Sequence, residues 1–549
     1  MMKQKKLLCI LLAAAMFLSL LAGCATKTSG TGAAVQNSET QRNENNDTQD
    51  TTAEATADAA PGEAPDGSAP SGDSPGDPPD GNGGPGGTPP GDPPDGNGGP
   101  GGTPPGDPPD GPGGPGGTPP GDPPDGNGGP GGTPPGGGGP GGSSADIDYS
   151  GAVEISAGDT QEGQSYASTT ADESALLIST SDAVTITNPT VTKSGDSDGG
   201  DSCNFYGLNA AVLVKDGTTT AITGGTITSD ASGANGVFCY GGNGGQNGAS
   251  GDGTTLIIKN TKIRTTGSGS GGIMTTGGGI TYAYDLDVET SGQSSAPIRT
   301  DRGGGMVYVS GGSYVSNGLG SPAIYYTAEI HVENATLISN LSEGVCIEGK
   351  NSIELTNCDL TADNTKRNSN ASFLDSIMIY QSMSGDADSG TSGFTMTGGS
   401  LTSKSGHVFH VTNTNAVITL KGVTITNEDA DGILLSVCDD GWSGAGNVAT
   451  LKAIAQSLSG AIKVGDNSTL TLELTEGSAF TGSVDGSITN AKGETVSTEV
   501  GTVSVTLDAS STWTLTGDSY ITAFNGSAAN VVANGYTLYV NGVALSGTN

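Results

Sequence analysis

The chain has 549 residues and a formal net charge of −38 at pH 7. A chain this acidic is repelled by a phosphate backbone, so its charge argues against nucleic acid as a partner. The same charge disfavours other polyanions unless a cation bridges the two surfaces.

Residues 1–23 have the composition of a secretion signal. Three lysines precede an apolar run from Leu7 to Leu20, an order that is typical of such signals. The ending Leu21-Ala22-Gly23-Cys24 resembles the bacterial lipobox, and this resemblance implies cleavage before Cys24 and lipidation of that residue. We therefore expect an extracytoplasmic protein that is lipid-anchored to the bacterial membrane and displayed at the cell surface. An ordinary signal peptide or a short transmembrane anchor is the alternative, although the run is shorter than the roughly 20 residues of a membrane span.

Residues 24–144 carry almost no large apolar side chain, so they cannot bury enough surface to offset the entropy of ordering. Four copies of a fifteen-residue unit that begins Gly-Asp-Pro-Pro-Asp-Gly occupy residues 76–135. Collagen is excluded because Pro105 and Pro108 break the three-residue glycine register. We predict a disordered tether, partly in the polyproline-II conformation, with an average end-to-end distance on the order of 60 Å.

A short pattern recurs nine times between Val184 and Ile425, within an ordered domain that we expect to cover residues 145–549. Two apolar residues alternate with polar ones, which predicts a strand, and a residue that tolerates positive φ follows two places later. Successive copies lie 23 to 41 residues apart. The predicted inward column is Ile186, Ile222, Ile258, Ala283, Val309, Val332, Leu355, Met396 and Leu420. The predicted corner column is Asn188, Gly224, Asn260, Asp285, Gly311, Asn334, Asn357, Gly398 and Gly422.

A base period in the twenties, with short strands, corners and no helical stripe, is typical of a solenoid of β coils. A second strand opens each later coil, for example at Ala211-Val212-Leu213. The pattern over residues 180–430 resembles the parallel β-helix of the pectate-lyase-like superfamily, which implies an all-β, right-handed parallel β-helix. We expect this fold for residues 145–549, with irregular coils after about residue 430. Residues 451–458 also fit helical spacing, but a coil-opening pattern after them favours a strand.

The cysteines and histidines do not form recognisable motifs. Five cysteines remain apart from Cys9 and Cys24, and their odd number and scattered spacing argue against a disulfide framework or a zinc site. We expect them to be small buried residues: Cys203, Cys239, Cys346, Cys358 and Cys438. His331, His407 and His410 lie in or beside predicted strands, and a Ser-His-Asp triad cannot be assembled from them by sequence alone.

One coil concentrates charged residues. Arg299 and Arg302 are two of only four arginines after the tether, and they directly follow a coil-opening strand. Alignment of the opening strands places two tyrosines one rung further and an acidic and a basic residue on the next rung. The guanidinium group of arginine can bind carboxylates or hydroxyls, and tyrosine rings beside it offer a flat surface, so together they suggest a groove for a glycan. The alternative is a structural ladder of charge pairs along the outside of the coils. The candidate ligand-binding residues are Arg299, Asp301, Arg302, Tyr325, Tyr326, Glu348 and Lys350.

Calcium is the one metal ion that the sequence suggests. Asp196, Asp198 and Asp201 gather carboxylates in one glycine-containing loop, and carboxylate oxygens are the ligands that Ca²⁺ prefers. A solvated acidic turn explains the same composition. We therefore treat these aspartates as a candidate Ca²⁺ site.

The expected function is binding of extracellular polysaccharide, or of another surface, by a lipoprotein with a β-helix, rather than catalysis. The chain also loosely resembles clostridial β-helix proteins that bind acidic polysaccharide through calcium. Pectate lyases have this fold, and the resemblance implies an arginine base with aspartate-held Ca²⁺, so Arg299 with Asp301 keeps a polysaccharide lyase acting on uronate polymers as an alternative. The signature strand motifs of those lyases are absent. An adhesin that is structural or binds protein is the third interpretation.

Overall fold

The computed structural model describes residues 147–244, 250–368, 371–382, 387–442 and 444–549. The predicted signal, the lipidation site Cys24 and the tether lie outside the described residues, so these three interpretations stay predictions. Among the residues described, no helix is long and apolar enough to cross a membrane.

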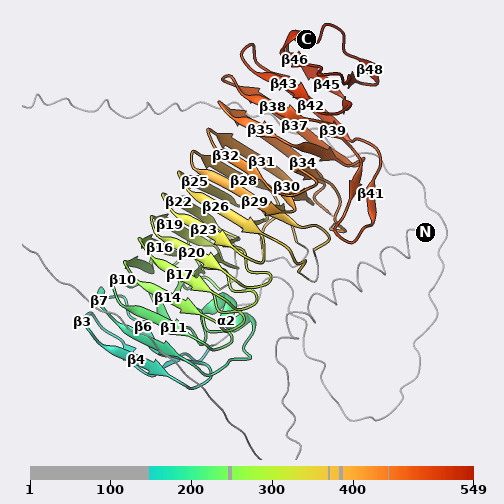
Figure 1. The fold of residues 1–549 in the computed structure, drawn as a ribbon. Coiled ribbons are helices and arrows are strands. Elements are labelled where there is room, and N and C mark those ends of the chain that lie inside the picture. The colour runs from blue at the N-terminus through green and yellow to red at the C-terminus, as the bar shows by residue number, and fades with distance from the viewer. Residues whose placement is uncertain (1–146, 245–249, 369–370, 383–386, 443) are drawn as a thin grey trace, which may run out of the picture. The chain divides into compact units, whose positions relative to one another are not determined.

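The described chain is a parallel β-helix in which the coils up to β32 add one strand to each of three long parallel sheets (Figure 1). The 14-stranded sheet contains, in order, β3 (Asp159–Glu162), β7 (Val184–Thr187), β10 (Thr219–Thr223), β13 (Thr255–Lys259), β16 (Gly279–Tyr284), β19 (Gly305–Ser310), β22 (Glu329–Glu333), β25 (Ser352–Thr356), β28 (Thr391–Thr397), β31 (Thr414–Lys421), β34 (Asn447–Ile454), β37 (Ser468–Thr475), β42 (Thr502–Leu507) and β45 (Ala523–Asn525). The 13-stranded sheet contains β2 (Glu154–Ile155), β6 (Leu176–Ser179), β9 (Val212–Lys215), β12 (Val237–Tyr240), β15 (Ile273–Thr276), β18 (Ile298–Thr300), β21 (Ile324–Tyr326), β24 (Val345–Glu348), β27 (Asp375–Tyr380), β30 (His407–Thr412), β33 (Ile433–Val437), β36 (Ala461–Val464) and β39 (Val484–Asp485). The 10-stranded sheet contains β4 (Ser165–Ser168), β8 (Thr190–Lys193), β11 (Thr226–Ser229), β14 (Lys262–Thr265), β17 (Asp287–Thr290), β20 (Ser313–Ser316), β23 (Thr336–Ser339), β26 (Asp359–Asp363), β29 (Ser400–Ser405) and β32 (Thr424–Asn427).

The smaller elements lie at the two ends and on the outside of the coils. Beyond β32 a four-stranded parallel sheet contains β35 (Ser457–Ser459), β38 (Ala479–Gly482), β43 (Thr512–Leu515) and β46 (Val531–Val532). The remaining elements are β1 (Ser150–Gly151), β5 (Glu173–Ser174), α2 (Asp201–Tyr206), β40 (Ile488–Thr489), β41 (Thr495–Ser497), β44 (Ser519–Ile521), η1 (Ala528–Asn530), β47 (Leu538–Val540) and β48 (Val543–Ala544). Residues 451–454 and 457–458 lie in strands, as predicted, and the coils continue to the C-terminal region.

The predicted repeat register is confirmed from β7 to β31 of the 14-stranded sheet. Ile222 is the partner of Ile186 on one side and of Ile258 on the other, and the inward column continues without a shift to Leu420. Every residue of the predicted corner column has positive φ, for example 50° at Asn188 and 70° at Gly224. A Cβ atom at Gly224 would collide with Oδ1 of Asn188 on the preceding rung. Asparagine and glycine on neighbouring rungs therefore complement each other at this corner.

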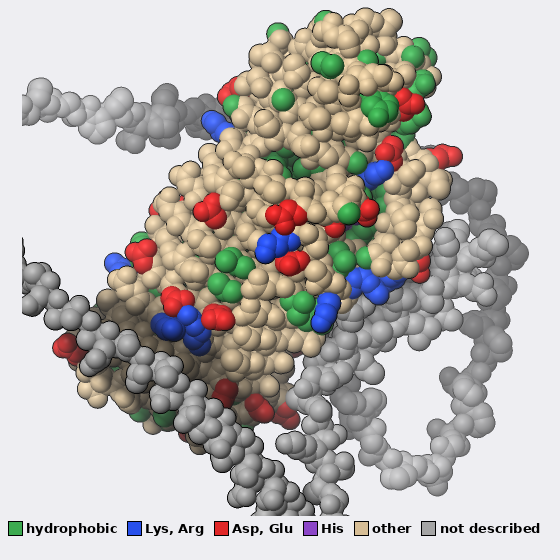
Figure 2. All heavy atoms as spheres, in the orientation of Figure 1, with side chains coloured by type: hydrophobic (Ala, Val, Ile, Leu, Met, Phe, Trp, Pro, Cys, Tyr) green, Lys and Arg blue, Asp and Glu red, His purple; other side chains and the backbone are tan. Residues whose placement is uncertain are grey.

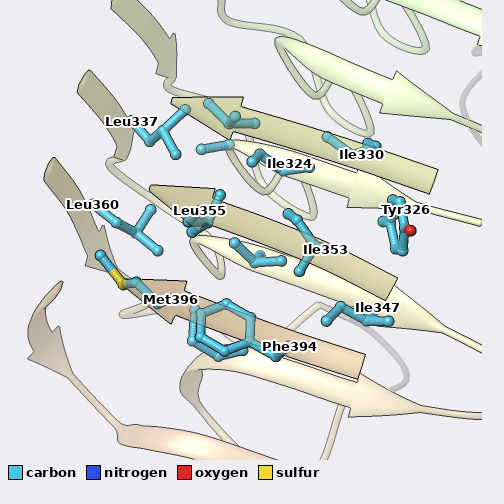
Figure 3. Packing of buried hydrophobic residues seen from close by; sticks show 14 of the residues in the cluster. Ile324, Tyr326, Ile330, Leu337, Ile347, Ile353, Leu355, Leu360, Phe394 and Met396 are labelled. Atoms are coloured by element: carbon cyan, nitrogen blue, oxygen red, sulfur yellow. The ribbon is translucent and has the colours of Figure 1, made fainter. Parts of the chain in front are cut away.

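One apolar core runs through the interior of the coils. Aliphatic side chains on successive rungs stack above one another: Ile330 pairs with Ile353, and Leu337 with Leu360, as Figure 3 shows. Each of these four side chains is at most 1% exposed. Since a single coil buries little surface by itself, this stacking between rungs supplies the hydrophobic stabilisation.

The outer face of the 13-stranded sheet is covered by added segments. Near the N-terminal end the short helix α2 and Tyr149 pack against outward residues such as Leu213 and Phe238. Near the C-terminal end Phe373, Cys438 and Ile488 form a second outer cluster. The sequence did not predict α2, because six residues are too few to show helical periodicity.

The outer surface of the coils is mostly polar and uncharged. Figure 2 shows acidic and basic side chains in small adjacent groups on a surface where other residue types predominate. The five cysteines named above are free and buried, which confirms the prediction that they act as small core residues. Burial raises the pKa of Cys203 to about 11 and that of Cys239 to about 12, so these thiols stay protonated near neutral pH.

Candidate functional site

The charged residues expected to form a glycan groove lie on the outer face of the 13-stranded sheet. Arg299 in β18 is the partner of Tyr325 in β21, as the rung alignment predicted. Nη2 of Arg299 donates to Oδ2 of Asp301 at 2.8 Å, and its guanidinium carbon lies 5.7 Å from the centre of the Tyr325 ring. The side chains of this ion pair are only 11% and 5% exposed. The structure therefore brings Arg299, Asp301 and Tyr325 together, but away from solvent.

Glu348 is a buried carboxylate surrounded by hydroxyl groups. Its Oε2 accepts hydrogen bonds from the hydroxyls of Tyr325 at 2.9 Å and Tyr380 at 3.1 Å, and its Oε1 accepts one from Ser382. Glu348 is 2% exposed. Burial, followed by the nearby Glu348 carboxylate, raises the pKa of Tyr380 well above its usual value. The phenol of Tyr380 consequently stays protonated and serves as a donor to Glu348.

The remaining residues of the predicted groove do not join this cluster in the expected way. Tyr326 points into the core, where its hydroxyl bonds to the backbone of Ser352 (Figure 3). Expecting it on the surface beside Tyr325 was wrong, because successive residues of a strand face opposite sides. The guanidinium of Arg302 lies over the ring of Phe205 in α2 at 4.3 Å, and Lys350 is exposed. The predicted seven residues are thus divided among the core, a buried outer cluster and the surface.

This arrangement resembles the structural ladder more closely than a groove. The Arg299 guanidinium donates to Asp301, to Oδ1 of Asn204 and to the carbonyl of Ser294. A lyase base must instead direct a lone pair at a proton of the substrate. With its N–H groups engaged and its side chain largely buried, Arg299 is poorly placed for that role.

The three aspartates of the candidate Ca²⁺ loop are exposed and are not gathered around a common point. Oδ1 of Asp196 accepts a hydrogen bond from the backbone N–H of Ser232, and Asp201 begins α2. In the part of the chain that the structure describes, no three His, Cys, Asp or Glu side chains could hold a metal ion. Asp196, Asp198 and Asp201 thus do not form such a carboxylate group among the described residues, and calcium binding stays a prediction.

A serine, two histidines and an aspartate meet in the buried outer layer, which sequence reasoning did not foresee. Oγ of Ser436 lies 2.7 Å from Nδ1 of His407 and 2.8 Å from Nδ1 of His410. Nε2 of His410 lies 3.9 Å from Oδ2 of Asp440. Ser436 and His410 are fully buried, so a substrate cannot reach the hydroxyl. The cluster is therefore part of the packing and not a hydrolytic triad.

An exposed site with recognition chemistry lies on the outer face of the 14-stranded sheet. It is a hollow of about 420 Å³, which we call the tyrosine hollow. Aromatic rings and carboxylates line it together, a combination suited to a ligand with both apolar and hydrogen-bonding surface. Its lining residues are Tyr282, Tyr284, Tyr308, Val309, Ser310, His331, Val332, Glu333, Glu354 and Thr356.

Three aromatic rings form a ladder along one side of the tyrosine hollow. Tyr282, Tyr308 and His331 are partners on neighbouring strands β16, β19 and β22. The ring centres of Tyr282 and Tyr308 lie 5.1 Å apart with an interplanar angle of 11°, and those of Tyr308 and His331 lie 5.0 Å apart at 6°. These separations match the spacing between adjacent strands, about 4.8 Å. The ladder is therefore a direct product of the repeat register.

A second outward column runs beside this ladder. Lys259, Tyr284, Ser310 and Glu333 follow one another on successive rungs. Nζ of Lys259 lies 4.7 Å from the centre of the Tyr284 ring, and Oγ of Ser310 donates to Oε1 of Glu333 at 2.9 Å. The register places Lys259 and Ser310 on opposite sides of Tyr284. Since serine is small, the side of the ring away from Lys259 opens into the hollow.

His331 ends the ladder between two carboxylates. Its Nε2 lies 2.8 Å from Oε1 of Glu329, and its Nδ1 lies 3.1 Å from Oε2 of Glu354. These contacts fix the orientation of the imidazole, so its ring stays parallel to that of Tyr308. The hollow is thus a preformed surface with Glu329, Glu333 and Glu354 at one end.

The tyrosine hollow is not visible in the inward and corner columns of the sequence, because its residues occupy outward positions. A signal was present: Tyr282, Tyr308 and His331 each stand three places before a corner residue, at Asp285, Gly311 and Asn334. Alignment of the outward positions would have shown three aromatic side chains on consecutive rungs.

Comparison of the chain with protein-family models, with curated proteins and with solved structures finds no match. What the chain binds must therefore be inferred from the chemistry of its surfaces. On that basis the tyrosine hollow is the candidate functional site. The buried Arg299 cluster has a structural role on the 13-stranded sheet.

Proposed function

We propose that this chain is a surface-displayed lipoprotein whose β-helix binds extracellular polysaccharide through the tyrosine hollow. The observation that carries the proposal is the Tyr282–Tyr308–His331 ladder, which stands beside carboxylate acceptors in an exposed hollow of about 420 Å³. The secretion signal and lipobox resemblance at Cys24 and the long tether support display at a distance from the membrane.

The chemistry of the hollow matches that of a sugar. A pyranose presents apolar C–H faces, which pack against aromatic surface, and hydroxyls, which need hydrogen-bond partners. Tyr284 is 36% exposed and offers ring surface, while Glu333 and Glu354 offer acceptors. The hollow thus provides for both parts of a sugar within one small area.

The dimensions and rigidity of the site also support the proposal. Two rung spacings, from Tyr282 to His331, span roughly 10 Å, which is about the length of two sugar residues. The rings are held by the sheet and by one another. A preformed surface loses little entropy when a ligand binds. A chain of several sugars would therefore find consecutive, fixed contacts along the coil axis.

The proposal is tested by presenting the purified full chain to an array of extracellular polysaccharides, with and without a calcium chelator. We expect retention on at least one polysaccharide, and we expect Tyr284→Ala and Tyr308→Ala to reduce it at least severalfold. The matched control is Tyr520→Ala, because Tyr520 is 43% exposed and stacks on Tyr539 with ring centres 5.1 Å apart, far along the chain from the hollow. Retention that is unaffected by either hollow variant, or no retention on any polysaccharide, would overturn the proposal. Loss of retention with the chelator would show that the expected calcium dependence is real.

A further inference from the structure

We infer that the tyrosine hollow selects sugars that carry a protonated amine, an inference that rests on the proposed function and names its ligand class. The first observation is the charge of the lining. Glu333 and Glu354 line the hollow, and Glu329 adjoins it through His331. No lysine or arginine is among the lining residues. A cationic ligand would therefore gain Coulomb energy in the hollow, and an anionic one would lose it.

The second observation is a ring face suited to an ammonium group. Lys259 already places its ammonium over one face of Tyr284, 4.7 Å from the ring centre. The opposite face looks toward Ser310, where a small side chain leaves room and where Glu333 stands one rung further. An amine at that position would have the π face on one side and a carboxylate on the other. This combination is the one that recognises alkylammonium groups.

The third observation concerns the ligands that the hollow disfavours. A uronate or a sulfated sugar would place its negative charge next to Glu333 and Glu354, and the chain as a whole carries a formal charge of −38. An N-acetylated amino sugar has no charge at the same atom and cannot form the cation–π contact. The predicted order of affinity is therefore free amine, then neutral hydroxyl or acetamide, then carboxylate.

The test compares β-linked oligomers that share one backbone and differ at a single position of each ring. Glucosamine, N-acetylglucosamine and glucose oligomers of equal length carry an ammonium, an acetamide and a hydroxyl at that position. Oligogalacturonate, which has a different backbone, is added as an anionic ligand. Binding of each to the full chain is measured by calorimetry at low and at physiological salt. We expect the glucosamine oligomer to bind at least fivefold more tightly than the glucose oligomer at low salt. This preference should shrink at about 0.15 M salt, where screening reaches within about 8 Å.

Two variants locate the selectivity. Glu333→Gln keeps an acceptor for Ser310 but removes the charge. It should reduce the preference for glucosamine over glucose oligomers roughly two- to fivefold, which is the change in affinity expected when one exposed charge pair is lost. The control is Glu473→Gln in β37, which stands in the same outward column as Glu354, four rungs away. At roughly 19 Å it lies beyond the screening length. It should leave the preference unchanged.

The outcomes separate this inference from the proposed function. Equal binding of glucose and glucosamine oligomers, abolished by Tyr284→Ala, would overturn the amine selectivity and leave polysaccharide binding intact. Failure of every oligomer to bind would overturn the amine selectivity, and the absence of retention on every polysaccharide of the array as well would overturn both. Tighter binding of a lysine-rich peptide than of glucosamine oligomers, at equal charge, would replace the sugar with a protein ligand and overturn the inference.

Discussion

The imidazole of His331 lies parallel to the phenol of Tyr308, with ring centres 5.0 Å apart and 6° between the ring planes. The stack exists because both residues occupy the same outward position on neighbouring strands. Tyr282 completes it on the other side of Tyr308. Tyr308 therefore contributes to two stacked pairs, and its removal interrupts the ladder at its centre.

The first prediction concerns the stability that this ladder adds. Tyr308→Ala should lower the free energy of unfolding by about 1 to 3 kcal/mol, because it removes two aromatic pairs that contribute about 0.5 to 1.5 kcal/mol each. Tyr308→Phe retains both stacks and should unfold like the parent chain. Urea unfolding followed by circular dichroism measures the difference. Equal stability of the alanine and parent chains would show that the stacking is energetically neutral.

The second prediction concerns the corners of the coils. Asn334 has a φ of 54° and Asn357 a φ of 51°. Replacing either by valine should cost on the order of 1 to 3 kcal/mol, because a β-branched residue is strained in the left-handed region. Replacing either by glycine, which accepts positive φ, should cost less. A glycine variant as unstable as its valine counterpart would show that the amide contacts, and not the backbone conformation, determine the corner.

The inward and corner columns could be predicted because every rung faces the same apolar interior and makes the same bend. Ile222 and Asn188 are examples: their residue types follow directly from burial and from positive φ. The outward positions have no such common environment. Tyr325 and Tyr326 show the difference, since adjacent residues of one strand face a covered outer surface and the core respectively.

The cover over the 13-stranded sheet could not be predicted either. Phe373 stacks on His410 with ring centres 4.3 Å apart, although the two residues come from different coils. Contacts of this kind depend on where insertions between coils fold back, and an insertion has no repeat to align. Arg299 was consequently expected at an open groove, whereas the segment around α2 encloses it.

The third prediction tests the structural role of the Arg299–Asp301 pair. Arg299→Ala should lower the free energy of unfolding by about 3 to 5 kcal/mol, because it leaves a buried aspartate without its partner. The comparison is Asp287→Ala, which breaks the more exposed Arg264–Asp287 pair and should cost at most about 1 kcal/mol. Thermal unfolding of both variants provides the measurement. A smaller loss for Arg299→Ala than for Asp287→Ala would contradict the structural reading.

The fourth prediction concerns membrane anchoring. Cys24→Ala should abolish lipidation and move the protein from the membrane fraction to the medium or the soluble fraction, because the lipobox resemblance makes this residue the acceptor. Cys9→Ala alters the other cysteine of the predicted signal and should leave anchoring intact. Fractionation followed by immunoblotting compares the two. Membrane retention of the Cys24 variant would refute the lipoprotein interpretation.

The last prediction concerns the response of the buried histidine cluster to acid. Burial lowers the pKa of His407 to about 4 and that of His410 to about 3, from 6.5. In the unfolded chain these side chains take up protons as the pH falls through 6.5, whereas in the folded chain they stay neutral until much lower pH. The unfolded state then binds more protons, so both histidines make the fold less stable as the pH drops from about 6.5 toward 4.

Two buried carboxylates in the same layer act in the opposite direction. Burial raises the pKa of Asp440 from 3.8 to about 6, and burial together with Glu343 and Asp440 raises that of Asp375 well above 3.8. As the pH falls from about 6 toward 3.8, the folded chain protonates Asp440 while the unfolded chain does not. This favours the folded state progressively, by on the order of 3 kcal/mol once the pH is below 3.8. Asp429, Asp431 and Lys463 also act on His407, the aspartates raising its pKa and the lysine lowering it.

The opposing signs can be separated by substitution. Asp440→Asn removes the stabilisation on acidification, so it should lose more stability than the parent chain between about pH 7 and about pH 4.5, by on the order of 2 kcal/mol. His410→Gln removes one destabilising proton uptake and should lose less than the parent chain over the same interval. Thermal unfolding at the two pH values gives the change in stability of each chain on acidification. Because each variant is compared with itself, the packing energy that its substitution removes at both pH values cancels. If both variants lost stability on acidification to the same extent as the parent chain, the buried cluster would not control the acid response.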